Sequence, residues 1–423
     1  MLYQRWQRIA RERADQIALI DLGANRGWTF AELENAAGRP ASGPAGLRFP
    51  QGNTSDFILD VLGAWRDGAV VCPLEPGQTV APVREPPGDI VHLKTTSATT
   101  GVARLVAFTA EELAADADNI VPTMGLRSDW PNLGVISLAH SYGFSNLVLP
   151  LLLHGIPLVL ADSPLPEAIR RAASVVGHAT LPAVPALWRA WRDADAIPRN
   201  VRLAISAGAP LPLSLEQEVF TKTGVKIHNF YGATECGGIS YDRSSTPRID
   251  ATCVGAPMEN VRLSINADGC LEVRSQAAGQ TYWPDAAPNL GPGCYRTADL
   301  AEIVNGHVFL RGRASDQINV AGRKVSPEAI ERALLKHPQV RDCLVFGAPS
   351  SDAGRGEMVV ACVVPQSGAS HGPGAEALKQ FVLADLPAWQ VPREWRFVES
   401  LAPNDRGKLS RAEWRARLGF TPS

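Results

Sequence analysis

The stretch Thr95-Thr96-Ser97-Ala98-Thr99-Thr100-Gly101-Val102-Ala103-Arg104 packs five hydroxyl residues, one glycine and a terminal arginine into ten positions. The residues before it predict a short strand at 89–93, and Thr109 with Glu112 forms the sequence pattern of a helix capping box. A hydroxyl-rich loop between a strand and a helix offers O–H and N–H donors to an anion, and Gly101 lets the backbone approach closely. The stretch therefore predicts a phosphate-binding loop without Walker spacing, against the alternative of an ordinary polar loop.

Downstream of this loop, predicted strands and helices alternate as far as residue 230. The predicted strands lie at residues 133–138, 157–160, 201–206 and 225–229, and the predicted helices at residues 167–176, 185–191 and 213–223. This alternation predicts an α/β fold with a mostly parallel sheet and helices on its faces. Ligands of such sheets gather beyond the carboxyl ends of the strands, and His140, Gly208 and Tyr231 fall at such ends.

The C-terminal part of the chain has a different pattern. From residue 252 to 311 the predicted strands are short and glycines are frequent, which predicts a small antiparallel, barrel-like sheet that includes a strand at 279–283. The remainder predicts a compact α+β unit with a hairpin at 317–325, helices at 327–336 and 376–386, and strands at 340–347 and 359–364. The predicted organisation is a large N-terminal domain, 1–313, containing the β-rich subdomain 252–311, and a small C-terminal domain, 316–423.

The composition is that of a globular protein, with 45% hydrophobic and 20% charged residues. The net charge of -2 predicts no nucleic-acid-binding surface. The N-terminus has no apolar signal core, and no run reaches the ~18 apolar residues of a membrane span, so we expect a cytoplasmic protein with no membrane span. The seven cysteines are scattered without a C-x-x-C pair, which predicts reduced, mostly structural thiols, Cys236 among them.

Four further motifs follow the hydroxyl-rich loop in order. They are Y-G-A-T-E at 231–235, Y-R-T-A-D-L at 295–300, R-G-R-A-S-D-Q-I at 311–318 with G-R-K-V at 322–325, and P-N-D-R-G-K-L at 403–409. With the loop at 96–104, this set resembles the adenylate-forming enzymes, which include acyl-CoA and aryl-CoA synthetases, luciferases and nonribosomal adenylation domains. The resemblance spans about residue 90 to the end, and its departures are Ala98, Ala103, Arg104 and Ala298.

The resemblance implies an acid-activation reaction. A carboxylate attacks the α-phosphate of ATP and expels pyrophosphate, which requires positive charge where two anions meet. Lys408 would bridge the carboxylate and the α-phosphate, and Thr234 would donate to that phosphate. Glu235 would hold Mg²⁺ as a hard oxygen ligand. The alternatives are a surface lysine for Lys408 and an acidic residue at a helix N-terminus for Glu235.

The resemblance also implies a nucleotide-binding set. Tyr231 would offer a flat face to adenine, Asp299 would accept the paired ribose hydroxyls, and Arg313 would reach the nucleotide. A structural ion pair is the alternative for Asp299 and Arg313. The full predicted set is Thr96, Ser97, Thr99, Thr100, Gly101 and Arg104 around the pyrophosphate, and Gly208, Ala209, Tyr231, Gly232, Asp299 and Arg313 around the rest of the nucleotide. Arg104 replaces a lysine of the family, keeping its charge but not its shape.

In the family, the C-terminal domain is mobile and rotates after adenylation about a hinge, here between Arg313 and Gln317. A second face near Gly322 then helps to line a channel for a pantetheine thiol. The implied acceptors are therefore CoA and the phosphopantetheine of an acyl carrier protein. Ser315 occupies the hinge position, where an acidic residue or lysine is usual.

His140 occupies a position where relatives that activate fatty or aryl acids carry histidine or an aromatic residue, which implies a catalytic or substrate-facing role. A buried core histidine is the alternative. Residues 134–153 contain no aspartate of the kind that holds a substrate ammonium in amino-acid-activating domains. The expected substrate is a small-molecule carboxylic acid, fatty or acyl acids being favoured and aryl acids the alternative, and Gly237 and Gly238 are expected to leave room for it.

The segment before residue 90 is shorter than its counterpart in the family. A shortened region would expose the site, favour a carrier-protein thiol, or need a partner to complete it. The rival to a ligase is a catalytically weakened nucleotide- or acyl-binding homologue that acts as a partner protein. The shortened N-terminal segment, Arg104 and Ser315 favour this rival, whereas Glu235, Asp299 and Lys408 oppose it. A third alternative is a luciferase-like oxidase, which no residue of this sequence distinguishes from a ligase. The oligomeric state is not predicted.

Overall fold

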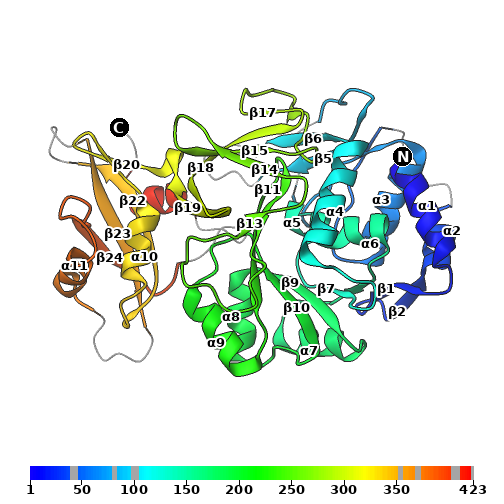
Figure 1. The fold of residues 1–423 in the computed structure, drawn as a ribbon, viewed down its shortest axis with the longest axis horizontal. Coiled ribbons are helices and arrows are strands. Elements are labelled where there is room, and N and C mark those ends of the chain that lie inside the picture. Colours follow the sequence, from blue (N-terminus) through cyan, green and yellow to red (C-terminus); the bar gives the residue numbers. More distant parts are fainter. Residues whose placement is uncertain are drawn as a thin grey trace.

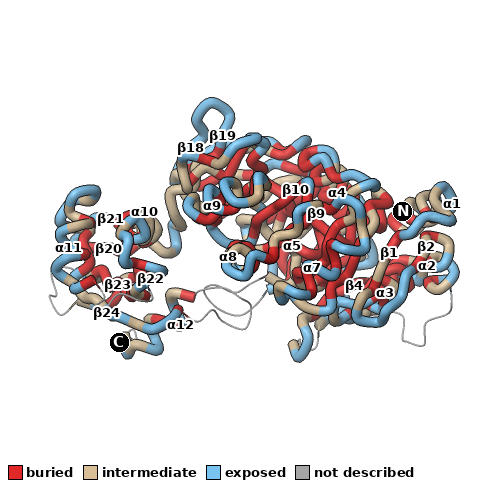
Figure 2. The backbone as a smooth tube through the Cα atoms, turned by 90° about the horizontal axis from the view of Figure 1, so that it is seen from below, coloured by how far each residue is buried: buried red, intermediate tan, exposed pale blue. Residues whose placement is uncertain are grey.

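The computed structural model describes residues 1–38, 46–78, 83–96, 104–350, 356–366, 373–401 and 410–420. A larger N-terminal part and a smaller C-terminal part lie side by side (Figure 1). Figure 2 shows buried residues in both parts. The buried hydrophobic clusters of the described residues divide in the same way: two lie between Leu2 and Val308, and two lie between Ile318 and Trp414. Within the described ranges, no helix combines the length and apolar character needed to cross a membrane.

Among the described residues, the largest sheet comprises nine strands, in the spatial order β13 (Ala256–Pro257), β12 (Gly237–Tyr241), β11 (Ile227–Ala233), β10 (Val201–Ser206), β9 (Ala179–Ala183), β7 (Asn132–Gly134), β8 (Leu158–Leu160), β1 (Ile17–Asp21) and β2 (Arg26–Thr29). The strands from β11 to β1 run parallel, and β2, β12 and β13 are antiparallel additions at the edges. Strands β7, β8 and β9 are buried throughout, as expected when helices cover both faces of a parallel sheet. The predicted α/β class is confirmed.

Helices from the crossover connections pack around this sheet. They are α4 (Ala110–Met124), α5 (Ser141–Gly143), the π-helical segment η1 (Phe144–Val148), α6 (Leu149–His154), α7 (Pro166–Ser174), α8 (Pro185–Asp193) and α9 (Leu213–Thr223). Helix α4 begins at the predicted capping box, where the Thr109 N–H donates to Glu112 Oε2 at 2.8 Å. Helices α8 and α9 lie together on one side, and α4 packs on α6 elsewhere (Figure 1).

The short N-terminal segment is part of the main core. It forms α1 (Leu2–Glu12), α2 (Phe30–Ala37) and α3 (Ser55–Asp67), at the end of the molecule far from the C-terminal part (Figure 1). Trp6 on α1 is fully buried, and its Nε1 donates to Glu34 Oε2 at 2.6 Å. Helix α1 also contacts α6, so this segment packs into the same core as the rest of the larger part.

A second sheet flanks the predicted phosphate loop. Within the described residues its five strands are, in order, β16 (Thr281–Trp283), β6 (Leu105–Thr109), β5 (Ile90–Thr95), β4 (Val70–Val71) and β3 (Leu47–Arg48). The assignment of residues 279–283 to the small antiparallel sheet was wrong, because Trp283 pairs with Leu105 and Thr281 with Ala107. The edge of β6 offers unpaired backbone groups, and β16 satisfies them across a long sequence distance.

A third, antiparallel sheet contains β14 (Arg262–Ile265), β15 (Cys270–Arg274), β17 (Leu290–Gly291), β18 (Cys294–Val304) and β19 (His307–Arg313). After the 3₁₀ turn η2 (Ala314–Asp316), the C-terminal part contains the hairpin β20 (Ile318–Val320) and β21 (Arg323–Val325), the sheet of β22 (Val340–Pro349), β23 (Glu357–Pro365) and β24 (Glu394–Phe397), and the helices α10 (Pro327–Leu334), α11 (Ala375–Leu383) and α12 (Arg411–Arg417). The predicted hairpin, helices and strands of this part are confirmed to within a few residues.

Candidate functional site

The Asp299 side chain joins β11 to the end of β19. Tyr231 Oη donates to Asp299 Oδ2 at 2.5 Å, and Arg313 Nε donates to Asp299 Oδ1 at 2.9 Å. Asp299 and Arg313 are also register partners across β18 and β19. Three residues that the sequence predicts for nucleotide binding, from three separate motifs, therefore lie in one hydrogen-bonded group.

Asp299 raises the pKa values of both of its partners, Arg313 and Tyr231. Burial lowers the pKa of Arg313, but the charge and hydrogen bond of Asp299 outweigh burial, so this pKa lies above its ordinary value. Burial, followed by the Asp299 charge, raises the pKa of Tyr231 well above its ordinary value, so its hydroxyl remains a donor. The structural ion pair that was the alternative for Asp299 is thus present. It still leaves acceptor capacity for ribose hydroxyls, because an ionised carboxylate has about four lone-pair sites.

A turn of two small residues, Gly208 and Ala209, lies at the end of the strand next to β11. Ser206 pairs with Asn229 in the parallel sheet, so Gly208 and Tyr231 each lie two residues beyond this pair. Gly208 lies past the end of β10, whereas Tyr231 lies within β11, which continues to Ala233. Gly208 has φ = +84°, in the left-handed region that favours glycine. Ala209, like Gly208, is exposed. The turn therefore carries only small side chains, as the predicted adenine site requires.

We expect Gly232→Ala to lower the free energy of unfolding by about 1–3 kcal/mol, because β11 and β12 must separate to admit the methyl group. A Cβ on Gly232 would lie 2.7 Å from the Gly237 carbonyl oxygen and 3.3 Å from Phe230 Cζ. Denaturant titration measures the change. The control is Gly27→Ala on β2, whose Cβ would meet no atom within 4 Å. Equal losses in the two variants would contradict this explanation.

Glu235 follows β11 and is held by a residue of the second sheet. Tyr282 Oη donates to Glu235 Oε1 at 2.9 Å, and Asn289 Nδ2 donates to Tyr282 Oη at 3.3 Å. Burial raises the pKa of Glu235 above its ordinary value, although the Tyr282 hydrogen bond and the Arg313 charge act to lower it. A cation beside this carboxylate would offset the cost of burying its charge.

The described residues contain no group of three or more His, Cys, Asp or Glu side chains that could hold a metal ion by themselves. Mg²⁺ in nucleotide sites is usually held by one or two carboxylates together with phosphate oxygens and water. A single half-buried carboxylate at Glu235 fits that donor set. The predicted metal role of Glu235 is therefore chemically consistent with the structure and stays a prediction.

Thr234 and His140 lie on neighbouring segments. Thr234 Oγ1 and Ser141 Oγ are 3.1 Å apart, so the Y-G-A-T-E motif touches α5. The Tyr142 N–H donates to His140 Nδ1 at 3.2 Å, which makes His140 the N-cap of this short helix. His140 is half-buried and has this local structural role, and its predicted role toward a substrate stays a prediction.

Thr96 and Arg104 hold the two ends of the predicted phosphate loop together. The Thr96 N–H donates to the Arg104 carbonyl oxygen at 2.8 Å, and the Arg104 N–H donates to Thr96 Oγ1 at 3.0 Å. The guanidinium carbon of Arg104 lies 3.5 Å from the centroid of the Tyr282 ring. The remaining predicted loop residues lie outside the described residues: Ser97, Thr99, Thr100 and Gly101.

Gly237 and Gly238 do not leave room for a substrate, contrary to the prediction. A Cβ on Gly237 would lie 2.0 Å from Asp116 Oδ1, and one on Gly238 would lie 2.2 Å from Met258 Sδ. The Gly238 N–H donates to Asp116 Oδ1 at 3.2 Å. Asp116 is buried and pairs with the buried Lys94 at 3.3 Å, so protein side chains fill the space beneath β12.

The predicted hinge lies at η2. Ser315 is exposed, and its hydroxyl donates to Asp316 Oδ1 at 3.0 Å. Asp316 pairs with Arg411, at the start of α12, at 2.8 Å, and Arg411 also pairs with Glu331 on α10 at 2.9 Å. Asp316 is therefore tied to the C-terminal part, and Ala314 and Ser315 are the residues between that part and β19.

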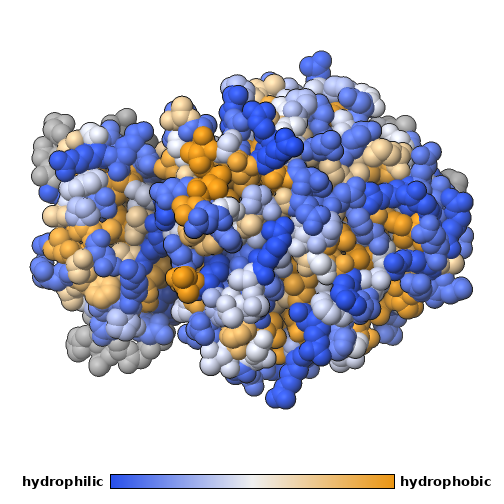
Figure 3. Space-filling view, in the orientation of Figure 1, coloured by the Kyte–Doolittle hydropathy of each residue, from blue (hydrophilic) through white to orange (hydrophobic). Residues whose placement is uncertain are grey.

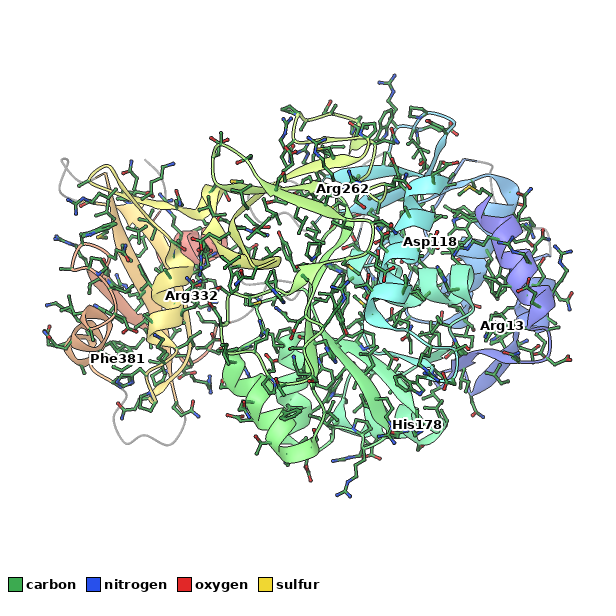
Figure 4. All side chains as sticks on the ribbon, in the orientation of Figure 1. Arg13, Asp118, His178, Arg262, Arg332 and Phe381 are labelled. Carbon is green, nitrogen blue, oxygen red and sulfur yellow. The ribbon has the colours of Figure 1, made fainter. Side chains whose placement is uncertain are left out.

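The two parts also meet beside α10, which contacts β19. Figure 4 labels Arg332 on this helix, and Figure 3 shows hydrophobic residues gathered near the junction in the same view. Burial lowers the pKa of Arg332, and the Arg311 charge adds to this effect, whereas the Glu328 charge opposes it. Lys408, the predicted catalytic lysine, lies outside the described residues and its role stays a prediction.

All seven cysteines, each within the described residues, are free. Cys236 directly follows Glu235 and is fully buried, and burial raises its thiol pKa well above the ordinary value. A buried thiol of this kind is not a nucleophile at neutral pH. The structural interpretation of Cys236 is therefore supported.

Sequence reasoning missed Tyr282 and Ser141. In the sequence, Tyr282 is an aromatic residue of a predicted strand, and no neighbouring residue indicates that its hydroxyl binds Glu235. Ser141 stood next to His140 in a segment already singled out. Both residues reach the site through contacts between segments that are far apart in the sequence.

Comparison with known proteins gives a consistent result. A model of the AMP-binding enzyme family matches residues 75–282, and a model of the AMP-binding enzyme C-terminal domain matches residues 329–408. The chain is 28% identical over 393 residues to a Mycobacterium tuberculosis protein named "Probable 2-succinylbenzoate--CoA ligase", covering 86% of this chain and 96% of that protein. It is 28% identical over 411 residues to the "Anthranilate--CoA ligase" of Pseudomonas aeruginosa, covering 90% and 73%. The structure of ATP-bound MatB from Rhodopseudomonas palustris superposes with a TM-score of 0.84 at 20% identity over 99% of both chains, which shows a shared fold.

Proposed function

This chain belongs to the adenylate-forming AMP-binding enzymes, and from that premise we propose that it couples ATP cleavage to the joining of a small-molecule carboxylic acid to a thiol, through an acyl-adenylate. The observation that carries the proposal is the hydrogen-bonded group of Tyr231, Asp299 and Arg313. It joins three motifs that are far apart in the sequence at one place, beside Glu235 and the ends of the hydroxyl-rich loop.

The first step is adenylation. A carboxylate oxygen of the acid attacks the α-phosphorus of ATP, and the bond from that phosphorus to pyrophosphate breaks. Asp299 would accept the ribose hydroxyls, and Thr234 would donate to the α-phosphate. Lys408 would neutralise the two anions as they meet, because a preorganised cation is most effective where charge accumulates in the transition state.

The second step is thioester formation. A thiol sulfur attacks the acyl carbon, AMP leaves with the bonding electron pair, and the thiol proton passes to solvent. Rotation of the C-terminal part about Ala314 and Ser315 would move Lys408 away and bring Gly322 toward the acceptor. We propose CoA as the acceptor, with the phosphopantetheine of an acyl carrier protein as the alternative.

Mg²⁺, when bound, would screen the phosphate charges and orient pyrophosphate as the leaving group. Glu235 is the residue proposed to hold it. Tyr282 donates to one oxygen of that carboxylate at 2.9 Å, which fixes its orientation. Arg104 and the residues of the loop would bind the departing pyrophosphate.

For the acid, we propose an aryl acid ahead of a fatty acid. The two relatives named above are, by their names, ligases of aromatic acids. Near His140, the rings of Tyr142 and Phe230 are 5.9 Å apart and form an aromatic pair on α5 and β11. A fatty acid, favoured from the sequence, is the second candidate.

The test is pyrophosphate release from MgATP over a panel of aryl and fatty acids, with mass-spectrometric detection of the acyl-adenylate. CoA and a phosphopantetheinylated carrier protein are then compared as acceptors. Acid-dependent pyrophosphate release supports the proposal, and release with fatty but not aryl acids reverses the order of substrates. ATP binding without release for any acid would contradict it and favour the weakened homologue.

A further inference from the structure

Tyr282 contacts two parts of the predicted phosphate site at once. Its hydroxyl donates to Glu235 Oε1 at 2.9 Å, and its ring lies under the guanidinium of Arg104, 3.5 Å from centroid to carbon. Glu235 ends the Y-G-A-T-E motif, and Arg104 ends the hydroxyl-rich loop. None of the sequence motifs includes Tyr282.

Tyr282 is held in place by burial, strand pairing and a hydrogen bond. It is 4% exposed, and its strand β16 pairs with β6 directly after Arg104, with Tyr282 opposite Val106. Asn289 Nδ2 donates to the Tyr282 hydroxyl at 3.3 Å, so the hydroxyl proton is directed toward Glu235. The ring and the hydroxyl are thus held from two directions.

Arg104 is suited to this arrangement. A planar guanidinium can stack on an aromatic face, whereas an ammonium is a strongly hydrated point charge. Arg104 Nη2 also donates to the Asp285 carbonyl oxygen at 3.3 Å, just beyond β16. The segment that carries Tyr282 therefore holds the arginine that replaces the lysine of the family.

We propose that Tyr282 is a positioning residue for MgATP, which orients the metal-binding carboxylate of Glu235 through its hydroxyl and the phosphate-loop cation Arg104 through its ring, an inference that rests on the proposed function. The hydroxyl contributes to the affinity for ATP only when Mg²⁺ is present. The ring contributes to the affinity for the phosphates of ATP, both with and without Mg²⁺.

The experiment is nucleotide binding by calorimetry, without acid, for the full chain and its variants. We expect Tyr282→Phe to weaken MgATP binding about tenfold, since a hydrogen bond to a charged group is lost, and to leave ATP binding in EDTA unchanged. Tyr282→Leu, which also removes the ring, is expected to weaken binding in both conditions, because the stacked cation loses its support.

The matched control is Tyr3→Phe. Tyr3 Oη donates to Glu34 Oε1 at 3.0 Å, and burial raises the pKa of both Tyr3 and Tyr282 to about 12, so the control loses a similar hydrogen bond far from the site. Thermal denaturation verifies folding of each variant. Equal MgATP affinities for Tyr282→Phe and Tyr3→Phe would overturn this inference alone. Failure of the unaltered protein to bind MgATP would overturn the proposed function as well.

Discussion

Lys408→Ala is expected to lower the rate of adenylate formation by at least ~10², because one preorganised donor to a developing anion typically contributes ~10²–10³ in rate. The measurement is single-turnover pyrophosphate release with a saturating acid. MgATP affinity is expected to change little, since Lys408 would act where the carboxylate meets the α-phosphate. Conversion of a preformed acyl-adenylate to the thioester is also expected to persist, because the lysine would have moved away by then.

The control for this variant is Lys336→Ala in the same C-terminal part. Lys336 is exposed and pairs with Asp385 at 2.7 Å, a surface ion pair whose loss costs little. We expect its pyrophosphate release to match that of the unaltered chain. Normal release by Lys408→Ala would remove the lysine from the mechanism.

The second large effect is expected for stability. Glu216 on α9 is fully buried, and its carboxylate binds Lys226 Nζ at 2.5 Å and Arg248 Nε at 2.9 Å. Both cations are also buried. Glu216→Ala leaves them facing a low-dielectric interior with one partner fewer, so we expect a loss of about 3–5 kcal/mol in the free energy of unfolding, measured by denaturant titration.

Glu218→Ala is the matched control, two residues further along α9. Glu218 pairs with Arg192, but its side chain is 54% exposed, so we expect a loss of at most about 1 kcal/mol. Lys226 directly precedes β11, which carries Tyr231 and Gly232. Glu216→Ala is therefore also expected to weaken nucleotide binding, whereas Glu218→Ala is not. Similar stability for the two variants would show that the buried ion group contributes little.

Local patterns in the sequence predicted much of the fold. The alternation of strands and helices predicted the parallel sheet, and the Thr109–Glu112 pattern predicted the start of α4. The hairpin of β20 and β21 was also predicted. Each of these depends on residues within a few positions of one another, where backbone preference and hydrogen bonding act directly.

The candidate site could be predicted only in part. Tyr231, Asp299 and Arg313 were predicted from motifs, and the structure joins them through two hydrogen bonds. Gly237 and Gly238 were expected to leave room for a substrate, but Asp116 and Met258 fill that space. A glycine shows that something approaches the backbone closely, and the sequence does not say whether that is a ligand or the protein itself.

By itself, the sequence determined the α/β class, the set of motifs and the chemical types of the residues that carry them. Only the tertiary structure decided that β16 pairs with β6 and not with the neighbouring antiparallel sheet, which brings Tyr282 between Glu235 and Arg104. The physical reason is that a strand presents the same backbone N–H and C=O groups to any sheet edge. Its local sequence therefore does not determine which strand it pairs with. Its partner is selected by the packing of the whole larger part, in which residues separated by more than a hundred positions compete for the same contacts.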